Sequence, residues 1–236
     1  MRGLALLGLA AVSCGGSTGL EMISYPLSAR GGAQPFTAGS WEITVEEAAV
    51  GFGPLYLCAS NTAAADHCST AVAEFADSAT VDAASPQPQQ LGQVQGFSAT
   101  VHSAIYDYAY SWLGEGAPRP LSGAPGGHSV RTRVTARQGE RVLRVLAELD
   151  LPPQQAGARA VQARLPERAQ SATLRLELVF DPAAWWKRID FDALAALGPE
   201  VTLPPSGPSG PVAQARSILI TALTSTDRPA FVWTEQ

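Results

Sequence analysis

The sequence contains very little lysine, histidine and cysteine for its length. Lys187 is the only lysine among 236 residues, so arginine supplies the remaining basic side chains. Charged residues make up 16% of the chain, and the formal net charge is −5. Nucleic-acid binding needs a basic surface that neutralises phosphates. This composition therefore disfavours nucleic acid as a partner.

Two short motifs of common catalytic sites are also missing. The sequence has no glycine-rich phosphate loop and no His-Glu-x-x-His zinc-binding helix. We therefore predict a binding or envelope-structural protein, with no cofactor and without enzymatic activity. Two other hypotheses remain open: a periplasmic protein that binds copper or zinc, and an extracytoplasmic hydrolase whose site is scattered in the sequence.

The first residues have the pattern of an export signal. Arg2 is followed by the apolar run Leu4 to Val12, which is too short to span a bilayer, since a helix needs about 20 apolar residues for that. No later apolar run is long enough either. The sequence Ala11-Val12-Ser13-Cys14 resembles the lipobox of bacterial lipoproteins, and the overall pattern of the chain is similar to uncharacterised lipoproteins of high-GC Gram-negative bacteria.

This resemblance implies that residues 1–13 are a signal peptide and that Cys14 becomes the lipidated first residue of the mature protein. Attachment to the membrane would then be through the lipid. No acidic residue directly follows Cys14, and in Gram-negative lipoproteins this implies the outer membrane. The alternative is an ordinary cleaved signal peptide in which Cys14 has no role.

Cys58 and Cys68 remain once Cys14 is set aside. In an exported protein an even pair of cysteines predicts a disulfide. The segment between them is small and polar, as expected for a surface loop. The alternative is a metal site that also uses His67.

The body of the chain alternates apolar and polar residues with a period of two, which predicts β-strands. Trp41 to Val45 and Ala172 to Phe180 follow this pattern, and Ser129 to Leu151 predicts a hairpin with arginines facing acids across the strands. We predict an antiparallel β-sandwich, Ig-like or jelly-roll-like, over residues 41–236. Residues 14–40 are predicted to form a tether with a possible first strand at Met22 to Leu27.

One helical insertion is predicted near residues 182–198. Asp181 and Asp190 are suitable N-cap residues, and Pro182 suits the first helical position. Val201 to Val212 is rich in Pro, Gly and Ser and predicts a loose loop. Ser217 to Leu223 and Ala230 to Trp233 are predicted as final strands.

Three groups of residues are candidates for a site. Three histidines from separate elements could converge on copper or zinc: His67, His102 and His128. Alternating aromatic residues could form a stacking platform for a glycan or an envelope protein, or could simply be core: Tyr106, Tyr108, Tyr110 and Trp112. A Ser129–His128 hydrolase pair is disfavoured, because neighbours on a strand point to opposite faces. The same rule predicts that the Glu46 and Glu47 side chains point apart.

Overall fold

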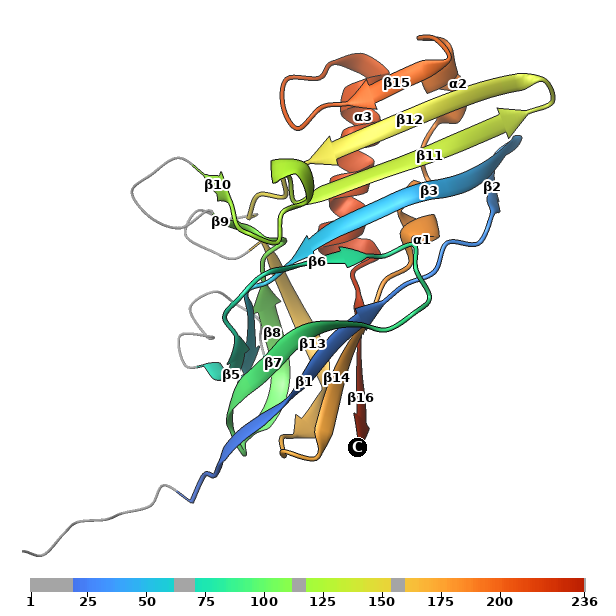
Figure 1. Cartoon of the computed structure of the whole chain (residues 1–236). Coiled ribbons are helices and arrows are strands. Elements are labelled where there is room, and N and C mark those ends of the chain that lie inside the picture. Colours follow the sequence, from blue (N-terminus) through green and yellow to red (C-terminus); the bar gives the residue numbers. More distant parts are fainter. Residues whose placement is uncertain (1–18, 62–70, 112–117, 154–159, 236) are drawn as a thin grey trace, which may run out of the picture.

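The structure is a computed structural model that describes residues 19–61, 71–111, 118–153 and 160–235. Two large sheets lie one above the other in Figure 1, and a layer of helices covers the rear of the upper sheet. The predicted β-sandwich with a short helical insertion is confirmed.

The lower sheet has eight strands and curves back on itself, and we call it the curled sheet. Its strands, in spatial order, are β13 (Val161–Ala169), β8 (Thr100–Tyr106), β4 (Leu55–Cys58), β5 (Ala71–Phe75), β7 (Gln89–Phe97), β1 (Met22–Arg30), β14 (Leu174–Val179) and β16 (Ala230–Glu235). Side chains bring its two edges together: Arg168 on β13 lies 3.4 Å from Glu235 on β16, and Arg228 donates to the Gln162 carbonyl.

The upper sheet carries the helices on one face, and we call it the helix-backed sheet. Its strands are β15 (Glu200–Leu203), β12 (Arg141–Leu149), β11 (Val130–Gln138), β3 (Trp41–Phe52) and β2 (Phe36–Ala38), with β6 (Ala79–Asp82) paired to the end of β3. A separate ribbon joins β9 (Tyr110–Ser111) to β10 (Arg119–Pro120), and a 3-10 turn (Pro125–Gly127) precedes β11.

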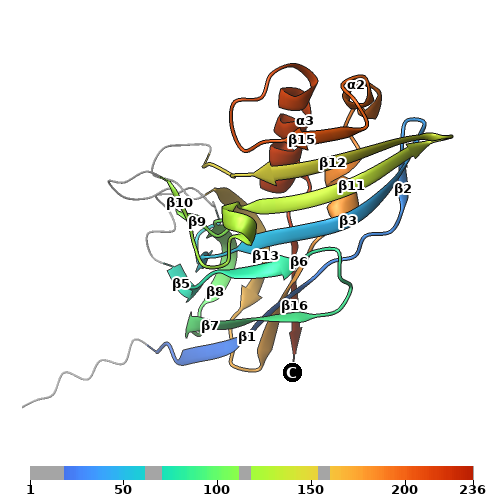
Figure 2. The ribbon, with the colours of Figure 1, turned by 45° about the horizontal axis from the view of Figure 1, so that its top comes forward.

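Three helices pack behind this sheet, as Figure 2 shows in a turned view. They are α1 (Pro182–Trp186), α2 (Phe191–Ala195) and α3 (Gly210–Thr221), which continues into a π-helical turn (Ala222–Thr226). The predicted caps are confirmed: the Asp181 carboxylate accepts from the Ala184 amide, and the Asp190 carboxylate from the Ala193 amide. At each helix N-terminus one carboxylate oxygen thus accepts a hydrogen bond from a backbone amide that has no partner within the helix.

The chain passes between the two sheets where β3 ends. Gly51 packs so closely there that an added Cβ would lie 2.6 Å from the Ala109 Cβ. Gly53 has φ +104°, a conformation that residues with a side chain rarely adopt, and it forms an isolated bridge with Tyr108, two residues beyond the end of β8. Glycine at these two positions therefore lets the chain pass from β3 in the upper sheet to β4 in the lower one.

A single apolar core joins both sheets and the helices. Its largest fully buried side chains include Trp41, Trp185, Trp186, Tyr25 and Phe52. The Trp186 indole N–H donates to Thr132 of β11 at 3.4 Å, and the Trp185 indole N–H donates to the Asp227 carbonyl at 3.2 Å. The tandem tryptophans of the insertion are thus both core residues that fix the helices to the sheet.

Two boundary predictions need correction. The predicted loop at residues 201–212 overlaps β15, and the predicted strand at residues 217–223 belongs to α3 and its π-helical turn.

The possible first strand at Met22 to Leu27 is confirmed. It is β1, which pairs with β7 and β14 inside the curled sheet, so residues of the predicted tether also belong to the fold.

Pairing is also not purely antiparallel. β1 runs parallel to β14, and β12 runs parallel to β15. The two strands of each pair are far apart in the chain, so no hairpin forces them to run antiparallel.

In the described part of the chain no helix is long and apolar enough to cross a membrane.

Candidate ligand-binding site

The front face of the helix-backed sheet carries charges because its strands alternate. On β11, Val134 and Ala136 are buried against the helices, while Arg131 and Arg133 lie on the opposite face. β12 follows the same rule in register, so Arg131 stands opposite Glu148. The predicted pairing of hairpin arginines with acids is confirmed at this position, where the Arg131 Nε lies 3.5 Å from the Glu148 carboxylate.

A bulge in β3 adds two acids to the same face. Arg133 pairs with Glu47 in the ladder, whereas the next residue, Val134, pairs with Val45. Glu46 is the extra residue, and both side chains project to the front: the Thr135 hydroxyl donates to Glu46, and Arg131 bonds Glu47. The prediction that these two side chains point apart is wrong, because the alternation rule fails at a bulge.

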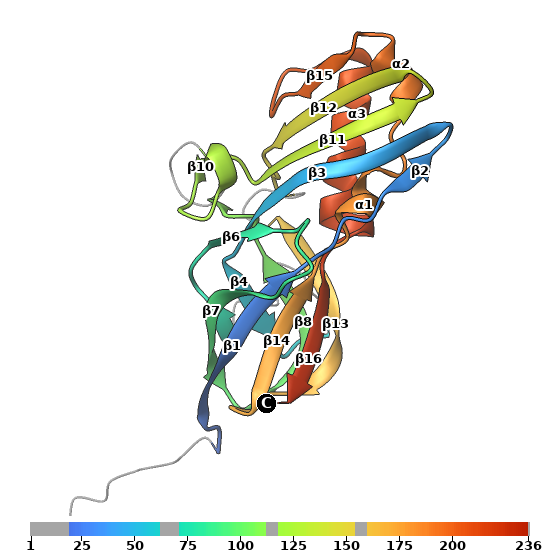
Figure 3. The same ribbon diagram turned by 45° about the vertical axis from the view of Figure 1, so that its right-hand side comes forward.

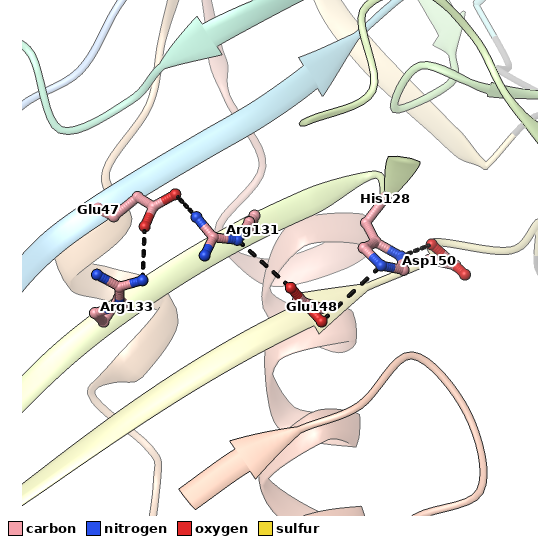
Figure 4. Close-up of polar contacts among 6 residues, drawn as sticks. All are labelled: Glu47, His128, Arg131, Arg133, Glu148 and Asp150. Carbon is pink, nitrogen blue, oxygen red and sulfur yellow. Dashed lines mark hydrogen bonds and ion pairs between the residues drawn. The ribbon is translucent and has the colours of Figure 1, made fainter. Parts of the chain in front are cut away.

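Six side chains form a connected row of charges across the front face, and we call it the charge row (Figure 4). At one end the Arg133 Nη2 lies 3.5 Å from a Glu47 oxygen, and Arg131 bonds the other oxygen of Glu47. Arg131 continues to Glu148, and at the far end His128 lies 3.0 Å from Asp150 and 4.0 Å from Glu148. Each carboxylate thus meets a basic side chain, as half-buried charges require.

A groove lies beside the charge row, on the same sheet. It has a volume of about 590 Å³, and its lining includes Glu46, Arg133, Arg144, Leu146, Glu200 and Thr202. Two of these lining residues form an ion pair: Arg144 lies 3.4 Å from Glu200, its partner position on β15. The groove therefore presents both signs of charge around an apolar side chain.

The two described histidines do not share a site. His102 is on β8 of the curled sheet, 3.9 Å from Glu167, whereas His128 precedes β11 in the other sheet. His67 lies outside the described residues. Among the residues that are described, no group of three His, Cys, Asp or Glu side chains is arranged to hold a metal ion. A copper or zinc site that includes His67 stays a prediction.

The position of Ser129 disfavours a role as a hydrolytic nucleophile. It is fully buried, and its hydroxyl oxygen accepts a hydrogen bond from the Leu151 amide at 3.1 Å. The neighbouring His128 lies in the charge row on the front face, with carboxylates beside both ring nitrogens. One Gly-x-Ser-x-Gly sequence does occur, at residues 15–19, but it directly follows Cys14 and all of it except Gly19 is outside the described residues.

Two of the four aromatic residues are core and not platform. Tyr106 and Tyr108 are fully buried, β8 ends at Tyr106, and Ala109 adopts φ +48°. Burial raises the pKa of both hydroxyls well above the ordinary tyrosine value. These two tyrosines are core residues.

Tyr110 is the one described member of the platform that reaches the surface. It is half-buried on β9, and burial together with the Asp150 charge raises the pKa of its hydroxyl. Trp112 lies outside the described residues, so a platform built on these two side chains stays a prediction.

The cysteine predictions stay predictions. Cys14 and Cys68 lie outside the described residues, and Cys58 is fully buried at the end of β4.

Comparison with known proteins gives distant likenesses. No family model and no curated protein matches the chain significantly. MbnP from Methylosinus trichosporium is 14% identical, with a TM-score of 0.39, over 92% of this chain and 99% of that one. A candidate cell adhesion protein from Bacteroides eggerthii is 10% identical, with a TM-score of 0.20, over 91% of this chain and 55% of that one.

Proposed function

We propose that this protein is a lipid-anchored extracytoplasmic binding protein that captures a charged segment of another envelope protein in the groove between β3, β11, β12 and β15. Export and anchoring rest on the leader and on Cys14. Binding rests on one observation: the front face of the helix-backed sheet leaves two arginines and two glutamates around an open groove.

The guanidinium groups of Arg133 and Arg144 can each bind a further carboxylate. The Arg133–Glu47 and Arg144–Glu200 contacts are 3.5 and 3.4 Å long, whereas strong arginine–carboxylate pairs are about 2.7–2.9 Å. The Arg144 and Glu200 side chains are 60% and 74% exposed. An incoming carboxylate can therefore take a bidentate place on either guanidinium without breaking a buried ion pair.

A polypeptide matches this lining better than a uniformly charged ligand does. Acidic side chains of a partner would meet Arg133 and Arg144, basic ones would meet Glu46 and Glu200, and Leu146 offers an apolar contact between them. Complementary charge of this kind sets the partner and the rate of encounter more than it sets affinity.

Photo-crosslinking in the native envelope tests the proposal. A photoreactive residue at Thr202 in the groove should give a discrete protein adduct, and one at Thr234 on β16 should not. Arg144→Glu should abolish the Thr202 adduct, because it reverses the charge that the ligand meets. Arg137→Glu is the matched control: Arg137 is an exposed arginine of β11 that does not line the groove, and it should leave the adduct intact.

Several outcomes would overturn the binding proposal. One is an adduct that survives Arg144→Glu, and another is the absence of any Thr202 adduct. A carbohydrate-sensitive adduct would move the assignment to a glycan. Anchoring is tested separately by the intact mass of the membrane-extracted protein, which should begin at a lipidated Cys14.

A further inference from the structure

The outer surface of the curled sheet carries an apolar patch where the chain enters the fold. Among the described residues five large apolar side chains are exposed, and three of them belong to this patch: Leu20 at 47%, Met22 at 80% and Phe97 at 45%. Met22 and Phe97 are direct partners in the β1–β7 ladder, so their side chains lie next to each other on one face.

The patch is fixed in place by backbone contacts. The Glu21 amide donates to the Ser98 hydroxyl at 2.8 Å, and the Ser98 amide donates to the Glu21 carbonyl at 2.8 Å. These bonds tie the segment before β1 to the end of β7. Leu20 is therefore held near the Met22–Phe97 pair.

The distance along the chain to Cys14 limits where this patch can be. Leu20 is six residues beyond Cys14, and an extended chain covers at most about 3.3–3.6 Å per residue. A lipid on Cys14 would therefore hold the Leu20 Cα within about 22 Å of the Cys14 Cα. β1 begins at one end of the fold (Figures 1 and 3), so this end would stay nearest the membrane.

We infer that Leu20, Met22 and Phe97 dock on the surface of the bilayer that carries the lipid anchor. This inference rests on the proposed lipidation of Cys14. Glu21 is also exposed, so the patch sits at the level of the headgroups and does not enter the hydrocarbon layer deeply. The lipid holds the protein at the bilayer, and the patch supplies a second, protein-borne contact that fixes its orientation there.

Oxidation of Met22 provides a direct test. The chain has two methionines, Met1 and Met22, and Met1 belongs to the signal peptide, so Met22 is the only methionine of a protein that begins at Cys14. The lipidated protein is reconstituted in phosphatidylethanolamine–phosphatidylglycerol vesicles and treated with chloramine-T, a charged oxidant. Sulfoxide formation at Met22 should be at least about fivefold slower than in the unlipidated Cys14→Ser protein, because a bilayer surface covers the thioether.

Two variants make the test specific. Phe97→Asp should return Met22 oxidation in vesicles to the rate of the unlipidated protein, while the protein stays in the vesicle fraction through its lipid. Val232→Asp is the matched control, since Val232 is a 37% exposed apolar residue on β16. It should leave Met22 protected.

The outcomes separate the two proposals. Equal oxidation rates in lipidated, vesicle-bound protein and in Cys14→Ser would overturn docking and leave the anchor standing. An unmodified N-terminus would overturn the anchor itself. Protection of Met22 in Cys14→Ser that rises with protein concentration would show that a second copy covers the patch, and this too would overturn docking on lipid.

Discussion

The Nδ1 atom of His128 lies 3.0 Å from the Oδ1 atom of Asp150. This contact joins the residue two positions before β11 to the residue directly after β12, so it closes the open end of their hairpin. The other ring nitrogen lies 4.0 Å from Glu148. His128 is therefore the one described histidine that belongs to the charge row.

His128 is also where a test for metal should begin. We expect protein purified from its own envelope to carry no stoichiometric copper or zinc by elemental analysis, because catalytic and structural sites need three or four convergent ligands. Any one-to-one metal content would contradict this expectation, and its loss in His128→Ala but not in His102→Ala would assign the metal to His128.

Tyr106 and Tyr108 both have buried hydroxyls, but we expect removal of the two hydroxyls to affect stability differently. The Tyr108 hydroxyl donates to the Leu223 carbonyl at 2.6 Å, whereas the Tyr106 hydroxyl donates to no acceptor among the described residues. Tyr108→Phe should lower the free energy of unfolding by about 1–2 kcal/mol, because it leaves a buried carbonyl unpaired. Tyr106→Phe should be neutral or stabilising.

Urea unfolding of the two tyrosine variants, followed by circular dichroism, measures this difference. A loss for Tyr106→Phe as large as that for Tyr108→Phe would show that the Tyr106 hydroxyl does have a partner in solution.

Alkaline pH should destabilise the protein through the same tyrosines. Burial raises the pKa of Tyr25, Tyr106 and Tyr108 in the folded state. The unfolded chain therefore releases these protons first, above its ordinary tyrosine pKa of about 10, and unfolding becomes more favourable as the pH rises. Stability should be level between pH 8 and 9.5 as far as these groups are concerned.

Above about pH 10 each such tyrosine should contribute a loss of up to about 1.4 kcal/mol per pH unit. Urea midpoints at pH 9, 10 and 11 measure this loss, and it should be smaller in Tyr106→Phe. A midpoint that stays constant up to pH 11 would contradict the prediction.

Asp190 should stabilise α2 through its cap. Its carboxylate accepts from the Ala193 amide at 2.9 Å, so Asp190→Ala should cost about 1 kcal/mol of unfolding free energy. Asp190→Asn keeps an oxygen acceptor and should cost much less. Thermal unfolding of the three proteins tests this, and equal losses in both variants would assign the effect to charge instead of to the cap.

Cys58 and Cys68 should be oxidised to a disulfide in the exported protein. Thiol titration of denatured, unreduced protein should then find neither thiol free. Cys68→Ser should lower stability by about 2–3 kcal/mol, because the unfolded chain regains the entropy of a short closed loop. Two free thiols in the unreduced protein would rule the disulfide out.

Strong local patterns predicted their elements well. Alternation predicted the first five residues of β3, and alternation with facing charges predicted the β11–β12 hairpin. The helix caps were predictable because Asp followed by Pro or by apolar residues satisfies free amides locally.

Elements that depend on distant partners were harder to predict. β13 contains Pro166 and several charges, and β7 contains four glutamines and Gly92. Neither segment has high intrinsic strand propensity, so pairing with β8 and β1 decides their structure. α3 was predicted partly as strand because Ile218 to Ile220 is a short apolar run, which periodicity alone cannot assign.

The candidate site itself was only half predictable. Arginines facing acids in the hairpin were visible in the sequence, but the bulge that turns Glu46 toward them was not, because it is defined by pairing with β11. The groove also needs β15, which joins β12 from more than 50 residues further along the chain.

The first residues of β1 and the strand β15 lie at opposite ends of the molecule (Figure 1). This arrangement separates the groove from the proposed membrane anchor. β1 has nine residues, which at about 3.3 Å each extend for roughly 30 Å. A protein anchored beside Met22, with β1 along the membrane normal, would hold its groove about this far from the lipid headgroups. Lipids of the same membrane would then be out of reach, and the groove would sample only molecules in the aqueous space or on a facing surface.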